Sequence, residues 1–367
     1  MKRAPWVRTP GNATPGLRRA GSAHDMSAMP QPPGFEQRDD QNDRALRPKR
    51  LQEFTGQTAV TRNLSLAIAA ATQRKEQLDH VLLSGPPGLG KTTLAHIMAA
   101  EMGAEIRETA APLLDKPGDL AGLLSTLKAG SILFIDEIHS LKRIVEEYLY
   151  SAMEDFRIAI QLGEGATSQS LTLTLPPFTL VGATTREGQL TAPFRSRFGI
   201  RERLDLYSDD ELQRILARSA QLLNVGADAA GLGMIASRSR GTARYANNHL
   251  RRIRDLAQVH HGNHIDEQVA AEGLRMLGID AAGLTELDRR ILGCLATHRR
   301  PVGLKTVAVT VGEDEATIED IYEPFLIQSG YLIKTPAGRV VTVKAYQHLG
   351  LTPPADSGPA DTQQRWV

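Results

Sequence analysis

Residues 85–92 hold the side chains and glycines best suited to chemistry in this chain. They read Gly-Pro-Pro-Gly-Leu-Gly-Lys-Thr, after an apolar run at 81–83 and before a run of helical character at 93–98. Glycines let successive backbone N–H groups turn towards one anion, and the N-terminus of the following helix adds partial positive charge. Lys91 would then reach the β- and γ-phosphates, and Thr92 would ligate Mg²⁺. A ligand-free glycine turn is the alternative, but agreement at all eight positions favours a nucleoside triphosphate site.

Two adjacent acids further along the chain complement this loop. Residues 131–135 read Ser-Ile-Leu-Phe-Ile, a pattern typical of a central parallel strand covered on both faces, and Asp136 and Glu137 follow directly. At the end of such a strand Asp136 is expected to hold Mg²⁺, and Glu137 to polarise the attacking water. A solvated acidic turn would explain the pair alone. Together with the glycine loop, the pair indicates an ATPase.

A third strand is expected at 178–183, ending in Thr184 and Thr185. A hydroxyl here would sit between the two earlier strands, near the γ-phosphate. Arg197 follows in the segment Arg-Ser-Arg, beside apolar anchors. An arginine that stabilises phosphoryl transfer can come from a neighbouring subunit, and Arg197 is our candidate. The alternative is an ordinary solvated arginine.

Eight short blocks of sequence carry a specific resemblance. They are Leu46–Lys49, Asp79–Leu83, Lys116–Leu120, Phe134–His139, Ala152–Phe156, Leu175–Leu180, Gly182–Arg186 and Ser196–Gly199. Together they resemble the RuvB family of AAA+ ATPases, the bacterial motors of Holliday-junction branch migration, from about residue 44 to 351. The resemblance implies an AAA+ fold and a homohexameric ring on the duplex DNA arms of Holliday junctions. It also implies partnership with RuvA and with the RuvC resolvase.

The same resemblance implies a set of site residues, with ATP and Mg²⁺ as cofactors. The expected catalytic residues are Lys91, Asp136, Glu137, Thr185, Arg197 and Arg244. The expected ATP contacts are Leu46, Arg47, Gly88, Gly90, Lys91, Thr92, Thr93, Glu154, Asp155, Phe156, Arg197, Tyr207 and Arg244. Thr92 and Asp136 would hold the metal. Arg244 would face the nucleotide from a lid, although Ala243 stands before it where the family usually has proline.

Strands and helices alternate from residue 44 to 204, which predicts an α/β core built on a doubly wound parallel sheet. An α-helical lid is expected at 205–280, and a winged-helix domain at 284–351. Residues 1–43 and 352–367 lack regular apolar spacing and are expected to be disordered, because they cannot bury enough surface to offset their ordering entropy. Met26 and Met29 are alternative starts of the chain.

A hairpin is expected inside the core, because residues 157–162 and 170–175 alternate with period two around a glycine-rich turn. This alternation is compatible with a hairpin that simply covers the edge of the core. The resemblance to the RuvB family implies that the apolar face of the hairpin binds RuvA. The candidate contacts are then Ile158, Ile160, Leu171 and Leu173.

The winged helix would bind DNA through Lys334 and Arg339 in its wing, by phosphate contacts that do not read sequence. Such domains also dock proteins, which is the alternative. Ala337 stands where the family wing typically has arginine.

Composition narrows the possible classes of protein but does not identify a function. The chain has 367 residues, 41% of them hydrophobic, and a formal net charge of +1, which argues against a histone-like binder. Its single cysteine, Cys294, lies in an apolar pattern typical of a core residue in a reducing compartment. No apolar stretch reaches the length of a bilayer span, so a soluble cytoplasmic protein is expected. The sequence leaves two function classes open: an ATP-driven motor on DNA, and a nucleotide-gated AAA+ switch of the clamp-loader kind.

Overall fold

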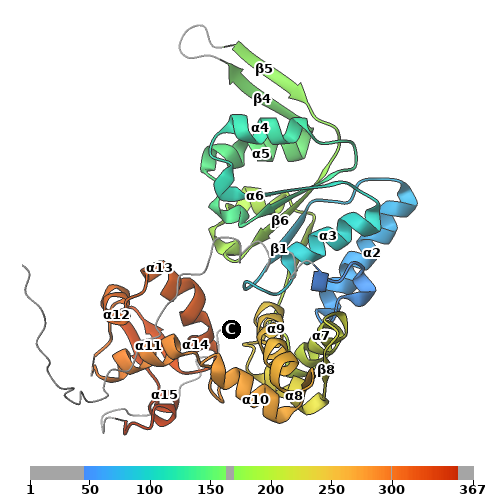
Figure 1. Cartoon of the computed structure of the whole chain (residues 1–367). Coiled ribbons are helices and arrows are strands. Elements are labelled where there is room, and N and C mark those ends of the chain that lie inside the picture. The colour runs from blue at the N-terminus through green and yellow to red at the C-terminus, as the bar shows by residue number, and fades with distance from the viewer. Residues whose placement is uncertain (1–44, 163–168, 299, 354–367) are drawn as a thin grey trace, which may run out of the picture. The chain divides into compact units, whose positions relative to one another are not determined.

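A computed structural model describes residues 45–162, 169–298 and 300–353. Of the ends expected to be disordered, residues 1–43 and 354–367 lie outside the described residues. The centre of the first region is a parallel sheet that contains the strands labelled β1 and β6 in Figure 1. The strand order of this sheet is β2-β3-β6-β1-β7. Its strands are β1 (Val81–Ser84), β2 (Ile106–Ala110), β3 (Ile132–Asp136), β6 (Thr179–Thr184) and β7 (Ile200–Arg203).

Strands β1, β3 and β6 form the middle of this sheet, and every residue in them is buried except the half-buried Asp136. Strand β6 pairs with β1 on one side and with β3 on the other. Because the three strands are parallel, their carboxyl ends meet at one edge of the sheet. The expected placement of Thr184 and Thr185 between the glycine loop and the acid pair is therefore confirmed.

Helices cover both faces of the sheet. Helices α2 (Thr58–Arg74) and α3 (Lys91–Met102) contribute to one hydrophobic cluster. Helices α4 (Pro117–Ser125), α5 (Arg143–Asp155) and α6 (Ala192–Ser196) contribute to another. The expected hairpin is present as the antiparallel pair β4 (Arg157–Leu162) and β5 (Gln169–Thr174), which extends past α4 and α5 in Figure 1.

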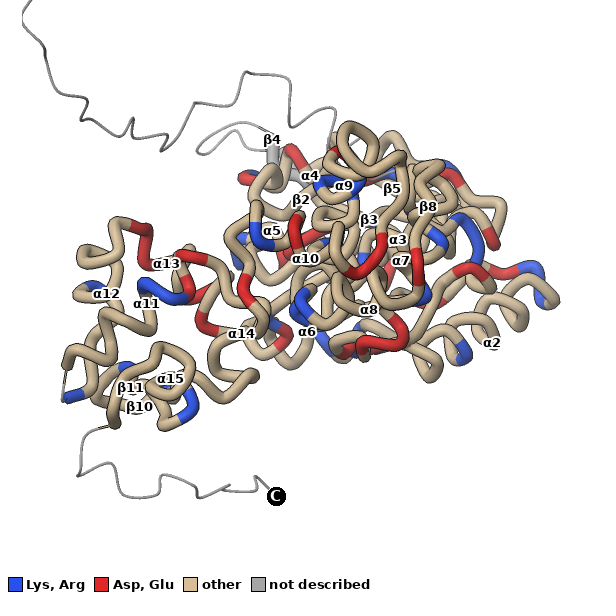
Figure 2. The backbone as a smooth tube through the Cα atoms, turned by 60° about the horizontal axis from the view of Figure 1, so that its bottom comes forward, with Lys and Arg blue, Asp and Glu red and all other residues tan. Residues whose placement is uncertain are grey.

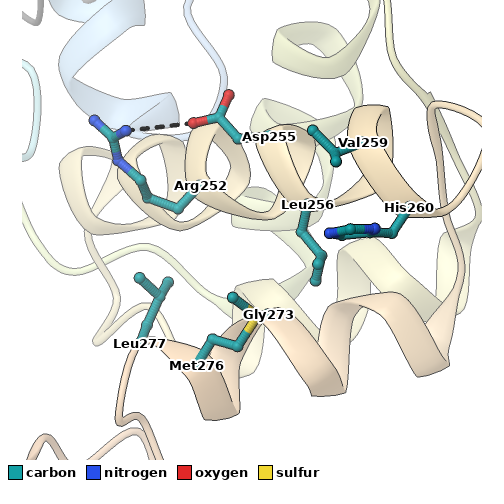
Figure 3. A pocket seen from close by; sticks show the side chains of 8 residues that line it. All are labelled: Arg252, Asp255, Leu256, Val259, His260, Gly273, Met276 and Leu277. Carbon is teal, nitrogen blue, oxygen red and sulfur yellow. Dashed lines mark hydrogen bonds and ion pairs between the residues drawn. The ribbon is translucent and has the colours of Figure 1, made fainter.

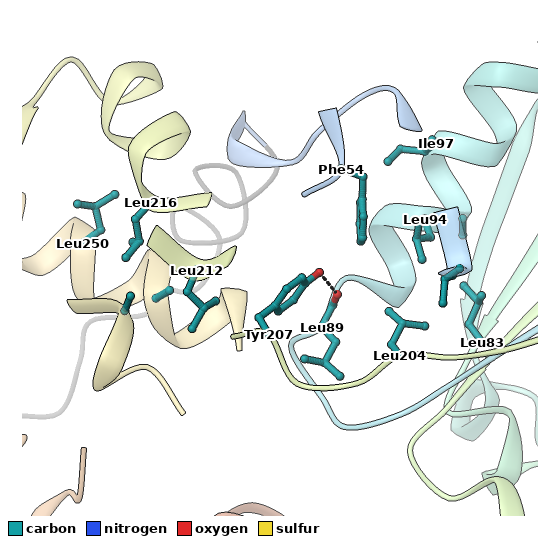
Figure 4. Packing of buried hydrophobic residues seen from close by; sticks show 14 of the residues in the cluster. Phe54, Leu83, Leu89, Leu94, Ile97, Leu204, Tyr207, Leu212, Leu216 and Leu250 are labelled. Carbon is teal, nitrogen blue, oxygen red and sulfur yellow. Dashed lines mark hydrogen bonds between the residues drawn. The ribbon is translucent and has the colours of Figure 1, made fainter. Parts of the chain in front are cut away.

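The helical lid follows strand β7. It consists of α7 (Asp209–Leu222), α8 (Ala229–Ser237), α9 (Ala243–His260) and α10 (Glu267–Met276), with a small parallel pair formed by β8 (Gly226–Ala227) and β9 (His264–Ile265). The first lid helix begins at a reciprocal capping box formed by Ser208 and Glu211. Lid residues such as Leu212 and Leu250 share one hydrophobic cluster with the α3 side of the sheet (Figure 4).

The C-terminal region is a winged helix with a hydrophobic cluster of its own. Its elements are α11 (Glu286–Ala296), α12 (Leu304–Val311), α13 (Glu315–Thr317), α14 (Glu323–Gln328), β10 (Leu332–Thr335), β11 (Gly338–Val341) and α15 (Val343–His348). A π-helical turn at Ile318–Tyr322 joins α13 to α14. Cys294 is buried in this cluster, as expected.

Charged residues of both signs are interleaved along the described chain (Figure 2). This distribution matches the near-zero net charge of the sequence. Among the described residues, no helix is both long enough and apolar enough to cross a membrane.

Candidate active site

Three glycines shape the loop between β1 and α3, and both their backbone angles and their surroundings exclude side chains. The φ angles are +133° at Gly85, +81° at Gly88 and +101° at Gly90, a region that L side chains rarely adopt. A Cβ at Gly85 would lie 2.4 Å from the carbonyl oxygen of Leu204, and one at Gly90 would lie 3.0 Å from the Phe54 ring. Helix α3 has no side-chain N-cap. Its first N–H groups are therefore available to an anion, and the loop fits a phosphate group.

Lys91 points into this loop, residues 85–92, which we call the cradle. Its Nζ donates hydrogen bonds to the carbonyl oxygens of Gly85 at 2.7 Å and Pro86 at 2.9 Å, and the residue is 7% exposed. Burial lowers the pKa of Lys91, while the nearby carboxylates of Glu137 and Asp136 oppose that shift. The ammonium group of Lys91 therefore lies inside the glycine loop.

The acid pair lies at the end of β3, as expected. Burial raises the pKa of Asp136, and the backbone N–H of Glu137, 3.0 Å from its carboxylate, opposes the shift. Glu137 has a φ of +48°, which turns the chain sharply after the strand. Its Oε2 accepts hydrogen bonds from the Thr185 N–H at 3.3 Å and the Thr185 hydroxyl at 3.1 Å. The structure thus brings Glu137 and Thr185 into direct contact.

The lid contributes Arg244 to the same place. The backbone N–H of Arg244 donates to the carbonyl oxygen of Gly88 at 3.3 Å, and a Cβ at Gly88 would lie 3.0 Å from the Cβ of Arg244. The charge of Arg244 adds to the lowering of the Lys91 pKa that burial causes, and it partly opposes the effect of burial on Asp136, whose pKa stays raised. The lid arginine, the loop lysine and the strand aspartate therefore share one electrostatic environment.

Two aromatic residues pack behind the cradle (Figure 4). Tyr207, expected from the family pattern, is 6% exposed and donates its hydroxyl hydrogen bond to the Leu89 carbonyl at 2.8 Å. Phe54 packs against Gly90, and sequence reasoning missed it because it follows a short 3₁₀ turn with no periodic signal. Leu46 is buried at 4% exposure, and its carbonyl oxygen accepts a hydrogen bond from Arg218 of α7 at 2.7 Å.

Arg197 belongs to a separate group of side chains. One of its terminal nitrogens lies 2.9 Å from the carboxylate of Glu154, and its guanidinium lies 4.5 Å from the centre of the Tyr150 ring, whose hydroxyl it also contacts. Its Nε has no hydrogen-bond partner among the described residues. Sequence reasoning missed Tyr150, although it stands four residues before Glu154 on α5 and therefore shares a helix face with it.

In the segment 154–156, expected near the nucleotide, Glu154 pairs with Arg197 and Asp155 acts on Arg197 through its charge. Phe156 stacks edge-on against Phe178 at 5.9 Å between ring centres, in the cluster on the α5 face of the sheet.

The hairpin requires one correction. Ile158 is 1% exposed and packs in the core cluster, so it cannot contact a partner from this position. Leu173 pairs with it in register and is partly buried against the same cluster, whereas Leu171 is 45% exposed. Ile160 pairs with Leu171, but its side chain lies outside the described residues. The alternation marked one face of the hairpin correctly, yet the base of that face covers the core.

The wing also differs from expectation. The side chain of Arg339 is 11% exposed, and two of its nitrogens lie 2.5 and 3.1 Å from the carboxylate of Glu323. Lys334 is 45% exposed and lies 2.6 Å from Glu319. In this arrangement Arg339 is an internal ion-pair partner and is not presented to DNA. Lys334 remains the predicted phosphate contact.

The described residues hold no group of three or more His, Cys, Asp or Glu side chains that would bind a metal by themselves. A magnesium site at Thr92 and Asp136 would therefore depend on phosphate oxygens to complete its ligands, as Mg²⁺ sites at nucleotides commonly do.

A hollow in the lid is a different feature. It lies between α9 and α10, has a volume of about 300 Å³, and is lined by Arg252, Asp255, Leu256, Val259, His260, Gly273, Met276 and Leu277 (Figure 3). None of these residues belongs to the glycine loop or to the sheet edge. We therefore do not assign the hollow to the nucleotide.

Comparison with known proteins gives consistent matches along the chain. Residues 46–204 match the RuvB Holliday junction DNA helicase P-loop domain, residues 207–280 the RuvB AAA lid domain, and residues 281–350 the RuvB C-terminal winged helix domain. Among solved structures, the Thermotoga maritima RuvB Holliday junction branch migration motor is 48% identical, with a TM-score of 0.77 over 84% of this chain and 100% of that chain. A single-substitution mutant of that protein gives 48% identity and a TM-score of 0.77 over 84% of this chain and 99% of its own.

Proposed function

The chain belongs to the RuvB family of Holliday-junction branch-migration motors and is a P-loop ATPase, and on that premise we propose that it works as a homohexameric ring. The ring would move the duplex arms of Holliday junctions, with RuvA docked on it and RuvC acting on the same junctions. ATP and Mg²⁺ would be its cofactors, and the cytoplasm its location.

In this proposal each residue at the sheet edge has one task. The glycine loop and Lys91 bind the β- and γ-phosphates, and Thr92 and Asp136 hold Mg²⁺. The metal, when bound, neutralises charge on the phosphate oxygens. Glu137 orients the attacking water and accepts its proton, while Thr185 holds the Glu137 carboxylate. Arg244 contacts the phosphates from the lid, so that the position of the lid depends on the bound nucleotide.

The observation that carries the proposal is the separation of Arg197 from this group. Lys91, Glu137 and Arg244 converge on the loop, whereas Arg197 is held by Tyr150 and Glu154 with one guanidinium nitrogen unpaired. An arginine in that position supports a site completed by a second copy of the chain. Its guanidinium would neutralise the charge that grows on the neighbour's phosphate in the transition state.

Mixed rings test this arrangement. Lys91→Ala subunits lack the cradle charge but keep Arg197, and Arg197→Ala subunits keep the cradle. Each variant alone should be inactive as an ATPase. A mixture should recover part of the activity, because an intact cradle then faces an intact arginine. Arg195→Ala, two residues earlier, is the matched control and should stay active alone. Failure of every mixture to recover, with mixed rings demonstrated by native mass spectrometry, would place Arg197 outside the neighbour's site.

A synthetic four-way junction separates the motor from the alternative switch. We expect ATP-dependent strand separation that increases when RuvA is added, with a Lys91→Ala protein as the inactive control. Nucleotide-dependent assembly without strand separation, under conditions where ATP is hydrolysed, would favour the switch. The exposed Leu171 and the wing Lys334 are the proposed contacts for RuvA and for duplex phosphates. Leu171→Ser should reduce the RuvA stimulation and leave basal ATPase activity unchanged.

A further inference from the structure

His139, two residues after the proposed catalytic glutamate, lies at the centre of a short polar network. Its Nδ1 is 3.1 Å from Oε2 of Glu137 and 2.9 Å from the hydroxyl oxygen of Thr184. The side chain of His139 is 10% exposed, and Thr184 is fully buried. Burial is the main cause of the lowered pKa of His139, so the ring is neutral at neutral pH and carries a single proton.

Counting donors shows that one ring nitrogen serves two competing partners. The hydroxyl oxygen of Thr184 already accepts a hydrogen bond from the N–H of Arg186 at 3.0 Å. If Nδ1 carries the ring proton, it donates towards the Glu137 carboxylate, and the Thr184 hydroxyl proton has no acceptor among the described residues. If Nε2 carries the proton, Thr184 donates to Nδ1, and the carboxylate then faces a lone pair. Each tautomer satisfies one neighbour at the expense of the other.

We propose that His139 is a positioning residue for hydrolysis. Its Nδ1–H tautomer orients the Glu137 carboxylate, and Thr184 at the end of β6 controls how often that tautomer forms. The proposal rests on the assignment of Glu137 as the group that accepts the water's proton.

The geometry indicates how the orientation works. The two Thr185 donors and His139 all contact the same carboxylate oxygen, Oε2. Held there, Glu137 presents its other oxygen, Oε1, for which the described residues supply no hydrogen-bond donor. That oxygen is the one available to a water molecule. Loss of the His139 contact would leave Thr185 alone to orient a carboxylate that is 37% exposed, on a backbone already turned into the left-handed region.

Two matched substitutions test the position of the donor. An asparagine amide lies close to where Nδ1 stands, whereas a glutamine amide lies nearer the Nε2 position. We therefore expect His139→Asn to keep most of the ATPase kcat and His139→Gln to lose about tenfold or more, a typical scale for misplacing a general base. The affinity for a non-hydrolysable ATP analogue and the melting temperature should stay close to wild type in both. A purely structural role would lower the melting temperature or the affinity, and equal kcat values for the two variants would overturn the proposal.

The role of Thr184 has its own readout. Thr184→Val keeps the β-branched shape in the strand but removes the competing hydroxyl. Thr184→Ser keeps the hydroxyl. ¹⁵N NMR of histidine-labelled protein distinguishes a protonated ring nitrogen from a bare one, and the His139→Asn spectrum identifies the His139 signals. The Nδ1–H population should increase in Thr184→Val and not in Thr184→Ser. No change in the Thr184→Val spectrum would overturn the assigned control.

Glu137→Gln, measured in the same assay, keeps this inference separate from the proposed function. An active Glu137→Gln protein would remove the premise itself. An inactive Glu137→Gln protein together with a fully active His139→Gln protein would leave the premise standing and refute the role of His139.

Discussion

The buried His249 of helix α9 should make the lid sensitive to mild acid. It is 8% exposed, its Nδ1 lies 3.3 Å from the Ser239 hydroxyl, and burial together with the charge of Arg240 lowers its pKa from 6.5 to about 4. The unfolded chain therefore binds a proton between pH 6.5 and pH 4 that the native lid does not. Because the unfolded state holds more protons in this window, the free energy of unfolding falls as the pH falls.

The size of the effect follows from the shift. A change of roughly 2.5 pKa units corresponds to about 3 kcal/mol, which would be lost completely only below pH 4, with about 1 kcal/mol lost at pH 5.5 and almost nothing above pH 7. Urea unfolding followed by circular dichroism between pH 7.5 and 4.5 measures it. Other groups titrate in the same range, so the relevant quantity is the difference between wild type and His249→Gln.

Wild type should lose more stability than His249→Gln as the pH falls, and the difference should grow steadily from pH 6.5 downwards. His260→Gln removes an exposed histidine from the same helix and serves as the control, with the wild-type slope expected. Parallel pH profiles for wild type and His249→Gln would refute the reasoning, since they would mean that the native lid protonates His249 without penalty.

Three further predictions concern the cradle. Glu137→Gln should bind ATP with near-normal affinity but lose hydrolysis, because an amide cannot take the water's proton, whereas Lys91→Ala should fail at binding itself; titration with a fluorescent ATP analogue beside a phosphate-release assay separates the two. Tyr207→Phe leaves the buried carbonyl of Leu89 without its donor and should lower the free energy of unfolding, measured with urea, by about 1 kcal/mol. An unfolding free energy equal to that of wild type within error would contradict this prediction. Gly85→Ala should abolish nucleotide binding and lower the melting temperature, since its Cβ would meet a backbone oxygen at 2.4 Å; a binding-competent variant would show that the loop can shift.

Much of the site was predictable because its residues follow buried strands. The pairs Asp136–Glu137 and Thr184–Thr185 each follow an apolar run, and parallel strands bring their carboxyl ends to one edge of the sheet whatever the loops do. The sequence pattern predicted that a hydroxyl would sit between the two earlier strands. Its contact with Glu137 is seen only in the structure, where β6 lies between β1 and β3. His139 carries no such pattern, and its contact with Thr184 depends on how the turn after β3 folds back.

The surface residues were harder to predict for a different reason. Alternation in the hairpin shows which side chains share a face, but not what lies above that face, so Ile158 looked like a partner contact and is a core residue. In the sequence, a wing cation that contacts DNA phosphates cannot be told from one that pairs with a carboxylate of the same domain. Arg339 is of the second kind, because it pairs with Glu323, sixteen residues earlier in the chain. Both cases depend on long-range packing that no local pattern encodes.

The division of the buried residues into three clusters has a consequence for how the chain opens. One cluster, on a single face of the sheet, joins α2 and α3 to the lid helices through residues such as Phe54, Tyr207 and Leu250. The cluster around α5 and that of the winged helix are separate. Regions that share apolar packing tend to open together and to exchange their amide hydrogens as one unit. We therefore expect the amides of α9 to slow down together with those of α3 when a ligand occupies the glycine loop, even though more than a hundred residues separate them. The winged helix, with its own core, should keep its exchange rates, so protection would spread along shared side-chain packing and not along the order of the chain.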